Sequence, residues 1–238
     1  MKHIVYYHKT PQSFQSKLIQ KAMAIFGMSK KMEKKIVQNS YRKTAAKIPK
    51  SIFKKYDVKV FEQDGRKVWE IEEKGSEAES IILYLHGGAY YANIIGQHWL
   101  FIKNLLVTVK AKIIVPDYPL APESGCLELY QFMDALYERL ITHYPNKRII
   151  LMGDSAGGGI ALSFAQKIRN ENKKQATDIL LFSPWLDVSM RNPEILKHEK
   201  NDKILSFTGL KYAGKKYAKT LDLKDYRVSP IYGNFKDL

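Results

Sequence analysis

The sequence has a single cysteine and no long hydrophobic run. Cys126 is the only cysteine in 238 residues, so no disulfide can form within the chain. No stretch reaches the roughly 18 consecutive apolar residues that a membrane span needs, and residues 1–9 lack the apolar centre of a signal peptide. With 45% hydrophobic residues, these features favour one soluble globular domain in the cytoplasm.

Acidic residues are scarce in the first quarter of the chain. Residues 1–57 contain 14 lysines and arginines but only Glu33 and Asp57, which gives this segment a net charge of +12 against +15 for the whole chain. Apolar residues and lysines recur here at the spacing of an amphipathic helix: Phe14, Leu18, Ala22 and Ile25 or Phe26, surrounded by Lys17, Lys21, Lys30 and Lys31. We expect residues 1–55 to be a basic helical cap that packs over the domain with its lysines in water.

The positive charge leaves other partners to consider. Contact with an anionic membrane surface or an acidic substrate is the alternative to a solvated basic face. Nucleic acid is not expected as a partner, because no zinc-ligand spacing, RNP-like motif or basic–aromatic repeat accompanies the charge. The lysine-rich segment could therefore make at most a peripheral membrane contact.

From residue 56 onward the hydrophobic pattern predicts an α/β domain over residues 56–238. Residues 56–61 and 68–71 alternate with period two around Asp64-Gly65, which is typical of an antiparallel hairpin. Buried strands are predicted at 81–85, 112–115, 148–152 and 179–182, and helices at 97–110, 123–143 and 156–170. This alternation predicts a three-layer sandwich in which helices cover both faces of a mostly parallel sheet.

A Gly-x-Ser-x-Gly motif lies where one of these strands meets a helix. Gly153-Asp154-Ser155-Ala156-Gly157 directly follows the strand at 148–152 and begins the helix at 156–170. Small flanking residues allow the strained turn that lifts a serine hydroxyl out of a sheet. Ser155 is therefore the candidate nucleophile, and we expect Asp154 to orient the loop and not to act as the catalytic acid.

A second motif follows the strand at 81–85, where the chain reads His86-Gly87-Gly88-Ala89-Tyr90. Glycines without Cβ let backbone N–H groups approach a substrate closely. The N–H groups of Gly87 and Gly88, with that of Ala156, are the candidate oxyanion hole. The aromatic residues expected to line an acyl pocket near these motifs are Tyr90, Tyr91 and Trp185.

Three ordered motifs carry a family resemblance: His86-Gly87-Gly88-Ala89-Tyr90, Asp117-Tyr118-Pro119-Leu120-Ala121-Pro122-Glu123 and Gly153-Asp154-Ser155-Ala156-Gly157-Gly158. With them, the chain closely resembles the hormone-sensitive-lipase-like branch of the α/β-hydrolases. The resemblance implies a serine carboxylesterase for small esters with short to medium acyl chains, with no metal or organic cofactor. It also implies that the N-terminal helices form a cap. Pro119 stands where family members commonly carry arginine.

The resemblance further implies that the catalytic acid and histidine lie on two strands after Ser229-Pro230-Ile231. The sequence stops at Leu238, so we expect a hydrolase core without its last two strands and with the 179–182 strand unpaired. The only histidine after Ser155 is His198, in a polar stretch that is expected to belong to the cap. His86, His98 and His143 are expected to be structural.

Three alternatives to an active esterase remain open. The chain could be a non-catalytic remnant, half of a split hydrolase completed by a C-terminal fragment, or a basic module that binds membrane surfaces. Pairing of the 179–182 edge strand in a homodimer is a further possibility.

Overall fold

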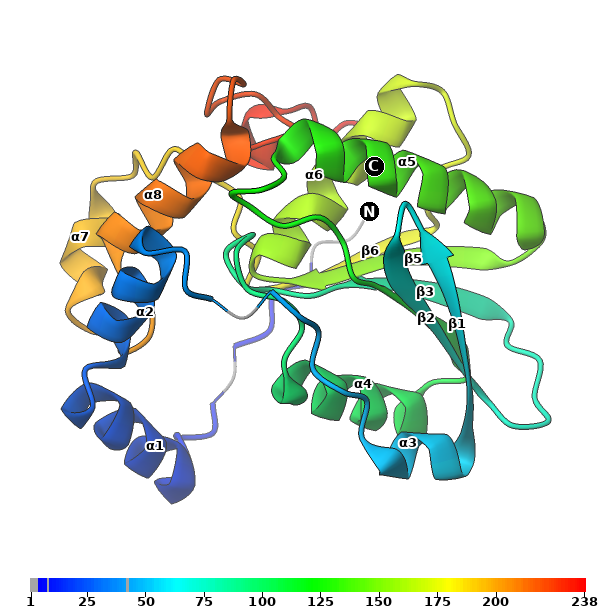
Figure 1. The fold of residues 1–238 in the computed structure, drawn as a ribbon, viewed down its shortest axis with the longest axis horizontal. Helices are drawn as coiled ribbons and strands as arrows, with labels where there is room; N and C mark the ends of the chain where they lie inside the picture. The colour runs from blue at the N-terminus through cyan, green and yellow to red at the C-terminus, as the bar shows by residue number, and fades with distance from the viewer. Residues whose placement is uncertain (1–3, 8, 42) are drawn as a thin grey trace.

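A six-stranded sheet forms the centre of the computed structural model, which describes residues 4–7, 9–41 and 43–238. Its strands lie in the order β1-β2-β4-β3-β5-β6 (Figure 1). The strands are β1 Tyr56–Gln63, β2 Arg66–Glu73, β3 Ser80–Leu85, β4 Ala111–Pro116, β5 Arg148–Asp154 and β6 Asp178–Phe182. β3 to β6 pair in parallel, whereas β1 and β2 form a hairpin that joins β4 in antiparallel fashion. The predicted mostly parallel sheet is confirmed.

Helices cover both faces of this sheet, as the alternating pattern predicted. They are α1 Phe14–Ile25, α2 Met28–Val37, α3 Lys50–Lys55, α4 Gly96–Thr108, α5 Cys126–His143, α6 Ala156–Asn170, α7 Glu194–Glu199 and α8 Phe207–Ala218, with a short 3₁₀ turn at Pro230–Tyr232. In Figure 1, α5 and α6 lie above the sheet and α3 and α4 below it.

The sheet separates two hydrophobic cores, and alternate residues of β3 belong to one or the other. Leu83 and Leu85 belong to the core under α5 and α6, and Ile82 and Tyr84 to the core over α3 and α4. This division follows from the period of two, since successive side chains of a strand point to opposite faces. The lower core is centred on Trp99, whose ring meets that of Trp69 edge-on at 5.4 Å.

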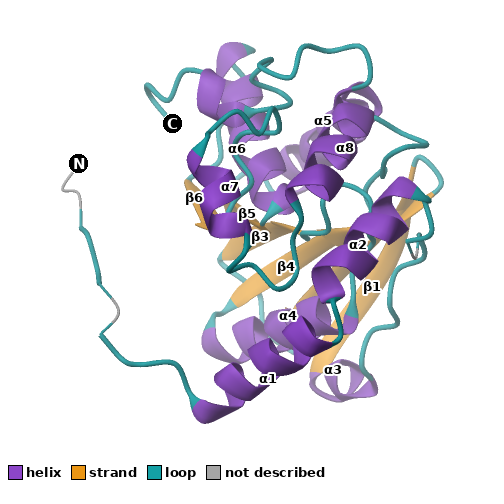
Figure 2. Ribbon diagram, turned by 90° about the vertical axis from the view of Figure 1, so that its left-hand side faces the viewer, coloured by secondary structure: helices purple, strands orange, loops and turns teal. Residues whose placement is uncertain are grey.

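The described part of the basic N-terminal segment, residues 1–55, contains the three helices α1, α2 and α3, and α1 lies where the amphipathic spacing from Phe14 to Phe26 predicted a helix. Gly27 separates α1 from α2 with a left-handed backbone (φ 57°) that favours glycine. α2 packs on α8, and the Ser29 hydroxyl of α2 donates at 2.8 Å to the carbonyl of Leu205, two residues before α8. α1 has no buried residue and lies beyond α2 when viewed from α8 (Figure 2). α2 therefore packs on the domain and α1 contacts α2, while a cap formed by residues 1–55 stays a prediction.

Candidate active site

Ser155 occupies a strained corner between β5 and α6. Its backbone has φ 49° and ψ −119°, a conformation that non-glycine residues rarely adopt and that is typical of functional sites. The corner is held from both sides, since the Ser155 N–H donates to the Phe182 carbonyl at 3.0 Å and the Ser155 carbonyl accepts from the Trp185 N–H at 2.8 Å. Such a strained strand-to-helix turn is what the Gly-x-Ser-x-Gly motif predicted, and the role of Ser155 as nucleophile stays a prediction.

The loop after β3 lies against this corner. A Cβ built on Gly87 would lie 3.1 Å from the Ser155 Cβ, and one built on Gly88 would lie 2.4 Å from the Ala92 carbonyl oxygen. Gly88 also has φ 138°. A side chain at Gly87 would therefore push the loop away from Asp154 and Ser155, and one at Gly88 would distort the loop itself.

The free backbone donors differ from those expected. The Gly87 N–H donates to the Asp154 carboxylate at 2.9 Å and is therefore not available to a substrate. Within the described residues, the N–H groups of Gly88 and Ala89 have no acceptor, and the N–H of Ala156 begins α6, where helical acceptors are absent. Of the predicted donors, Gly88 and Ala156 stay candidates for the oxyanion hole, and the free N–H of Ala89 in the same loop is a third.

Asp154 connects the loop of residues 86–90, named the oxyanion loop, to the core. Its Oδ1 accepts hydrogen bonds from the Tyr84 hydroxyl at 2.7 Å and from the Gly87 N–H, and its Oδ2 lies 3.6 Å from Nε2 of His98. His98 Nδ1 accepts from the Ile95 N–H at 3.1 Å, so a neutral His98 carries its proton on Nε2, facing the carboxylate. Burial alone would raise the pKa of Asp154, but the contacts with His98 and Tyr84 outweigh it and lower that pKa.

His86 braces the same loop from inside. It is fully buried, its Nδ1 lies 2.8 Å from the Gly87 carbonyl, and its ring stacks on Tyr118 at 4.3 Å. Burial lowers the pKa of His86 to about 4, so the imidazole is neutral at pH 7 and donates from Nδ1. This environment fits the structural role expected from the sequence.

The aromatic residues predicted to line an acyl pocket have different surroundings. Tyr90 and Tyr91 are each 1% exposed, and Tyr90 stacks on Tyr217 with ring centres 3.7 Å apart. Their burial does not fit a substrate-lining role and makes them supports of the oxyanion loop. Trp185 is half-buried, with its ring 5.4 Å from that of Tyr90, and keeps a surface that a substrate can reach.

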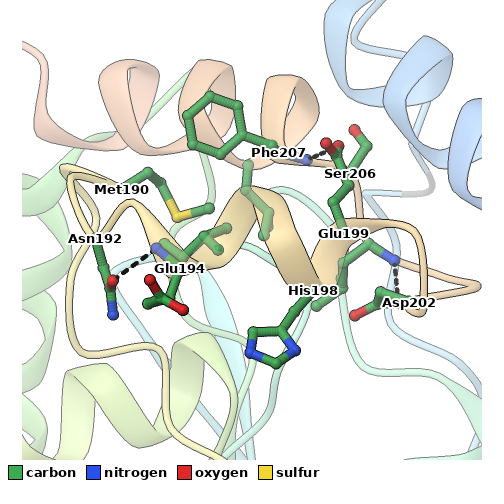
Figure 3. Close-up of a pocket in the computed structure, with 11 residues that line it drawn as sticks. Met190, Asn192, Glu194, His198, Glu199, Asp202, Ser206 and Phe207 are labelled. Carbon is green, nitrogen blue, oxygen red and sulfur yellow. Dashed lines mark hydrogen bonds between the residues drawn. The ribbon is translucent and has the colours of Figure 1, made fainter.

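In the part of the chain that the structure describes, no histidine or carboxylate hydrogen-bonds to the Ser155 hydroxyl. His98 faces Asp154, and His143 contacts the Arg139 carbonyl of its own helix. His198 lies on α7, where it lines a cavity of about 380 Å³ between α7 and α8 (Figure 3). Its position in a peripheral helical element agrees with the prediction from the sequence.

Replacing Asp154 by alanine should loosen the oxyanion loop. The substitution removes the acceptor of the Tyr84 hydroxyl and of the Gly87 N–H, and we expect the free energy of unfolding to fall by about 1 to 3 kcal/mol. Urea denaturation measures this loss. Asp154→Asn keeps one acceptor oxygen and should recover part of it. Equal losses for the two variants would mean that the hydrogen bonds to Oδ1 contribute little.

The stability that Asp154 provides should vanish in acid. Its pKa is lower in the folded chain than its ordinary value of 3.8, so its ionised form stabilises the fold above that value, and the contribution is lost as the pH falls through the folded pKa. Unfolding free energies of the natural chain and Asp154→Asn, measured from pH 7 to pH 3, should therefore converge below about pH 4. A difference that stays constant over this range would contradict the assignment.

Comparison with known proteins places this geometry in a family. The α/β-hydrolase fold family matches residues 82–238. An esterase of Acinetobacter venetianus is 30% identical over 166 residues, which cover 68% of this chain and 54% of that protein. An ethyl acetate hydrolase of Pseudomonas putida is 26% identical over 166 residues, covering 66% of this chain and 51% of that protein.

The folds agree as well. The crystal structure of EstE5 soaked with p-nitrophenyl butyrate superposes with a TM-score of 0.76 at 24% identity, covering 95% of this chain and 76% of that chain. The chain spans about half the length of the curated relatives it matches. The resemblance inferred from the three sequence motifs is thus confirmed, and the chain belongs to the α/β-hydrolase fold family.

Proposed function

We propose that this chain is a serine carboxylic-ester hydrolase for esters with short to medium acyl groups, with Ser155 as the nucleophile. The observation that carries the proposal is the strained corner at Ser155, beside the three unpaired N–H groups of Gly88, Ala89 and Ala156. The activities named for the relatives from A. venetianus and P. putida support an ester substrate, and ethyl acetate supports a short acyl group.

The chemistry follows from these groups. The Ser155 oxygen attacks the ester carbonyl carbon and passes its proton to solvent water, and the carbonyl oxygen becomes an oxyanion that the three N–H groups stabilise. Collapse of this intermediate releases the alcohol, which takes up a proton, and leaves an acyl-serine. Water then attacks the acyl carbon and releases the carboxylic acid. Each oxyanion donor contributes about 3 kcal/mol of barrier lowering in enzymes of this kind.

Ser155 supplies the attacking oxygen and the three N–H groups bind the oxyanion. Within the described residues, no side chain hydrogen-bonds to the Ser155 hydroxyl as a general base. A serine hydroxyl without a base is a weak nucleophile. Oxyanion stabilisation and substrate binding alone still accelerate acyl transfer by about 10³ to 10⁴ over water. Slow turnover is therefore the minimum that this geometry supports, and any faster rate depends on attack by Ser155.

Covalent labelling tests the assignment of the nucleophile. The folded chain is incubated with an alkyl fluorophosphonate, which phosphonylates activated serines, and the adduct is located by peptide mass spectrometry. We expect one adduct on Ser155. A folded chain that stays unlabelled, or one labelled on another serine such as Ser183, would overturn the proposal.

A further inference from the structure

Helix α1 carries an apolar stripe that no other described residue covers. Phe14, Leu18 and Ile25 are 78%, 58% and 81% exposed, and their spacing of four and seven residues places them along one side of the helix. Ser16 and Met23, which are half-buried, lie on the opposite side. The stripe therefore faces away from the protein.

Positive charge borders this stripe. Lys17 and Lys21 are exposed and lie along one edge of it at helical spacing, and α1 contains no acidic residue. Lys30 and Lys31 extend the positive surface onto α2, where Lys31 lies 5.7 Å from the ring of the exposed Phe26. Long lysine side chains beside an apolar strip can keep their ammonium groups in the polar layer while the strip is buried.

We propose that α1 docks on an anionic lipid surface, with its apolar stripe at the boundary between headgroups and acyl chains and its lysines at the lipid phosphates. An apolar strip bordered by lysines is the pattern of helices that lie in the plane of a membrane. Charge complementarity selects this occupant. A second copy of α1 would bring Lys17 and Lys21 against the same two lysines, whereas an anionic bilayer offers opposite charge along the whole helix.

The proposed membrane contact is peripheral. None of the helices in the described ranges is long and apolar enough to cross a membrane. α2 fixes the membrane-facing helix to the domain, because it packs on α8 and buries Ile36. None of these residues belongs to the Ser155 site, so a loss of vesicle binding can be distinguished from a loss of ester hydrolysis.

Vesicle sedimentation tests the proposal with the full chain. We expect binding to vesicles of phosphatidylcholine with 30% phosphatidylglycerol and little binding to phosphatidylcholine alone. Raising NaCl from about 0.1 M to 0.5 M should weaken binding. Lys17→Gln with Lys21→Gln should weaken it about tenfold or more, and Leu18→Ser should also weaken it.

Matched variants separate this surface from general charge and hydrophobicity. Lys54→Gln with Lys59→Gln removes two exposed lysines elsewhere, and Val107→Ser removes an exposed apolar side chain of α4. These controls should bind as the natural chain does, and circular dichroism confirms that every variant is folded.

Three results would overturn the proposal. One is binding that does not depend on phosphatidylglycerol, and another is an equal loss in the control variants. The third is a dimer of the natural chain that Leu18→Ser converts to a monomer while vesicle binding is unchanged, which would make the stripe an interface between copies.

Discussion

Replacing Ser155 by alanine is expected to abolish ester hydrolysis through an acyl-serine. Turnover of p-nitrophenyl butyrate should fall about 100-fold or more, to the slow rate that oxyanion binding alone supports, because the methyl group of alanine cannot form the acyl intermediate. The variant keeps Cβ and the backbone of the elbow, so its free energy of unfolding should stay within about 0.5 kcal/mol of the natural value. Release of p-nitrophenol, corrected for spontaneous hydrolysis and for the folded fraction, measures the effect.

Ser183 offers a matched control for this experiment. It is an exposed serine with φ 43°, close to the 49° of Ser155, and it follows directly after β6. Ser183→Ala should leave the rate unchanged, since that serine has no place in the proposed reaction. Turnover in Ser155→Ala at the rate of the natural chain would show that another group attacks the ester and would remove the basis of the proposed function.

Replacing Gly157 by alanine should prevent stable folding. A Cβ on Gly157 would lie 2.0 Å from the Leu85 carbonyl oxygen and 2.6 Å from that of His86. Both atoms belong to the backbone at the end of central strand β3, which cannot move without displacing its neighbours β4 and β5. We expect the free energy of unfolding to fall by at least about 3 kcal/mol, with an earlier urea midpoint or an insoluble chain.

Gly96 provides the comparison for Gly157. It begins α4, and a Cβ there meets no atom within 4 Å. Gly96→Ala should therefore be neutral or stabilise the chain by up to about 1 kcal/mol, as alanine reduces the freedom of the unfolded backbone. If Gly157→Ala shifted the urea midpoint no more than Gly96→Ala does, α6 would not approach β3 as closely as the structure indicates.

The sequence predicted the sheet and its helices because each depends on local patterns. The strand expected at 148–152 is observed as Arg148–Asp154, and the helix expected at 156–170 is observed as Ala156–Asn170. The Asp64-Gly65 turn joins β1 to β2 as predicted, with φ 50° and 71°. Apolar periodicity and turn residues identify such elements, since burial and backbone conformation select the residue types directly.

Features that depend on contacts distant in sequence were not predictable in the same way. The use of the Gly87 N–H by Asp154 joins residues 67 apart, and no local pattern distinguishes a glycine that binds substrate from one that binds the protein. The sequence motif predicted that Tyr90 and Tyr91 lie near the site. It could not predict that Tyr90 is buried against Tyr217 of α8, which lies 127 residues further along the chain.

The pairing of α2 with α8 also bears on how the chain folds during synthesis. α2 ends at Val37 and α8 at Ala218, so roughly 180 residues must be translated after α2 before its partner is complete. At about 5 to 20 residues per second, this takes about 10 to 35 s. Throughout that interval, Ile36 is presented on the nascent chain without its native cover. Helix α2 therefore reaches its final position only late in translation.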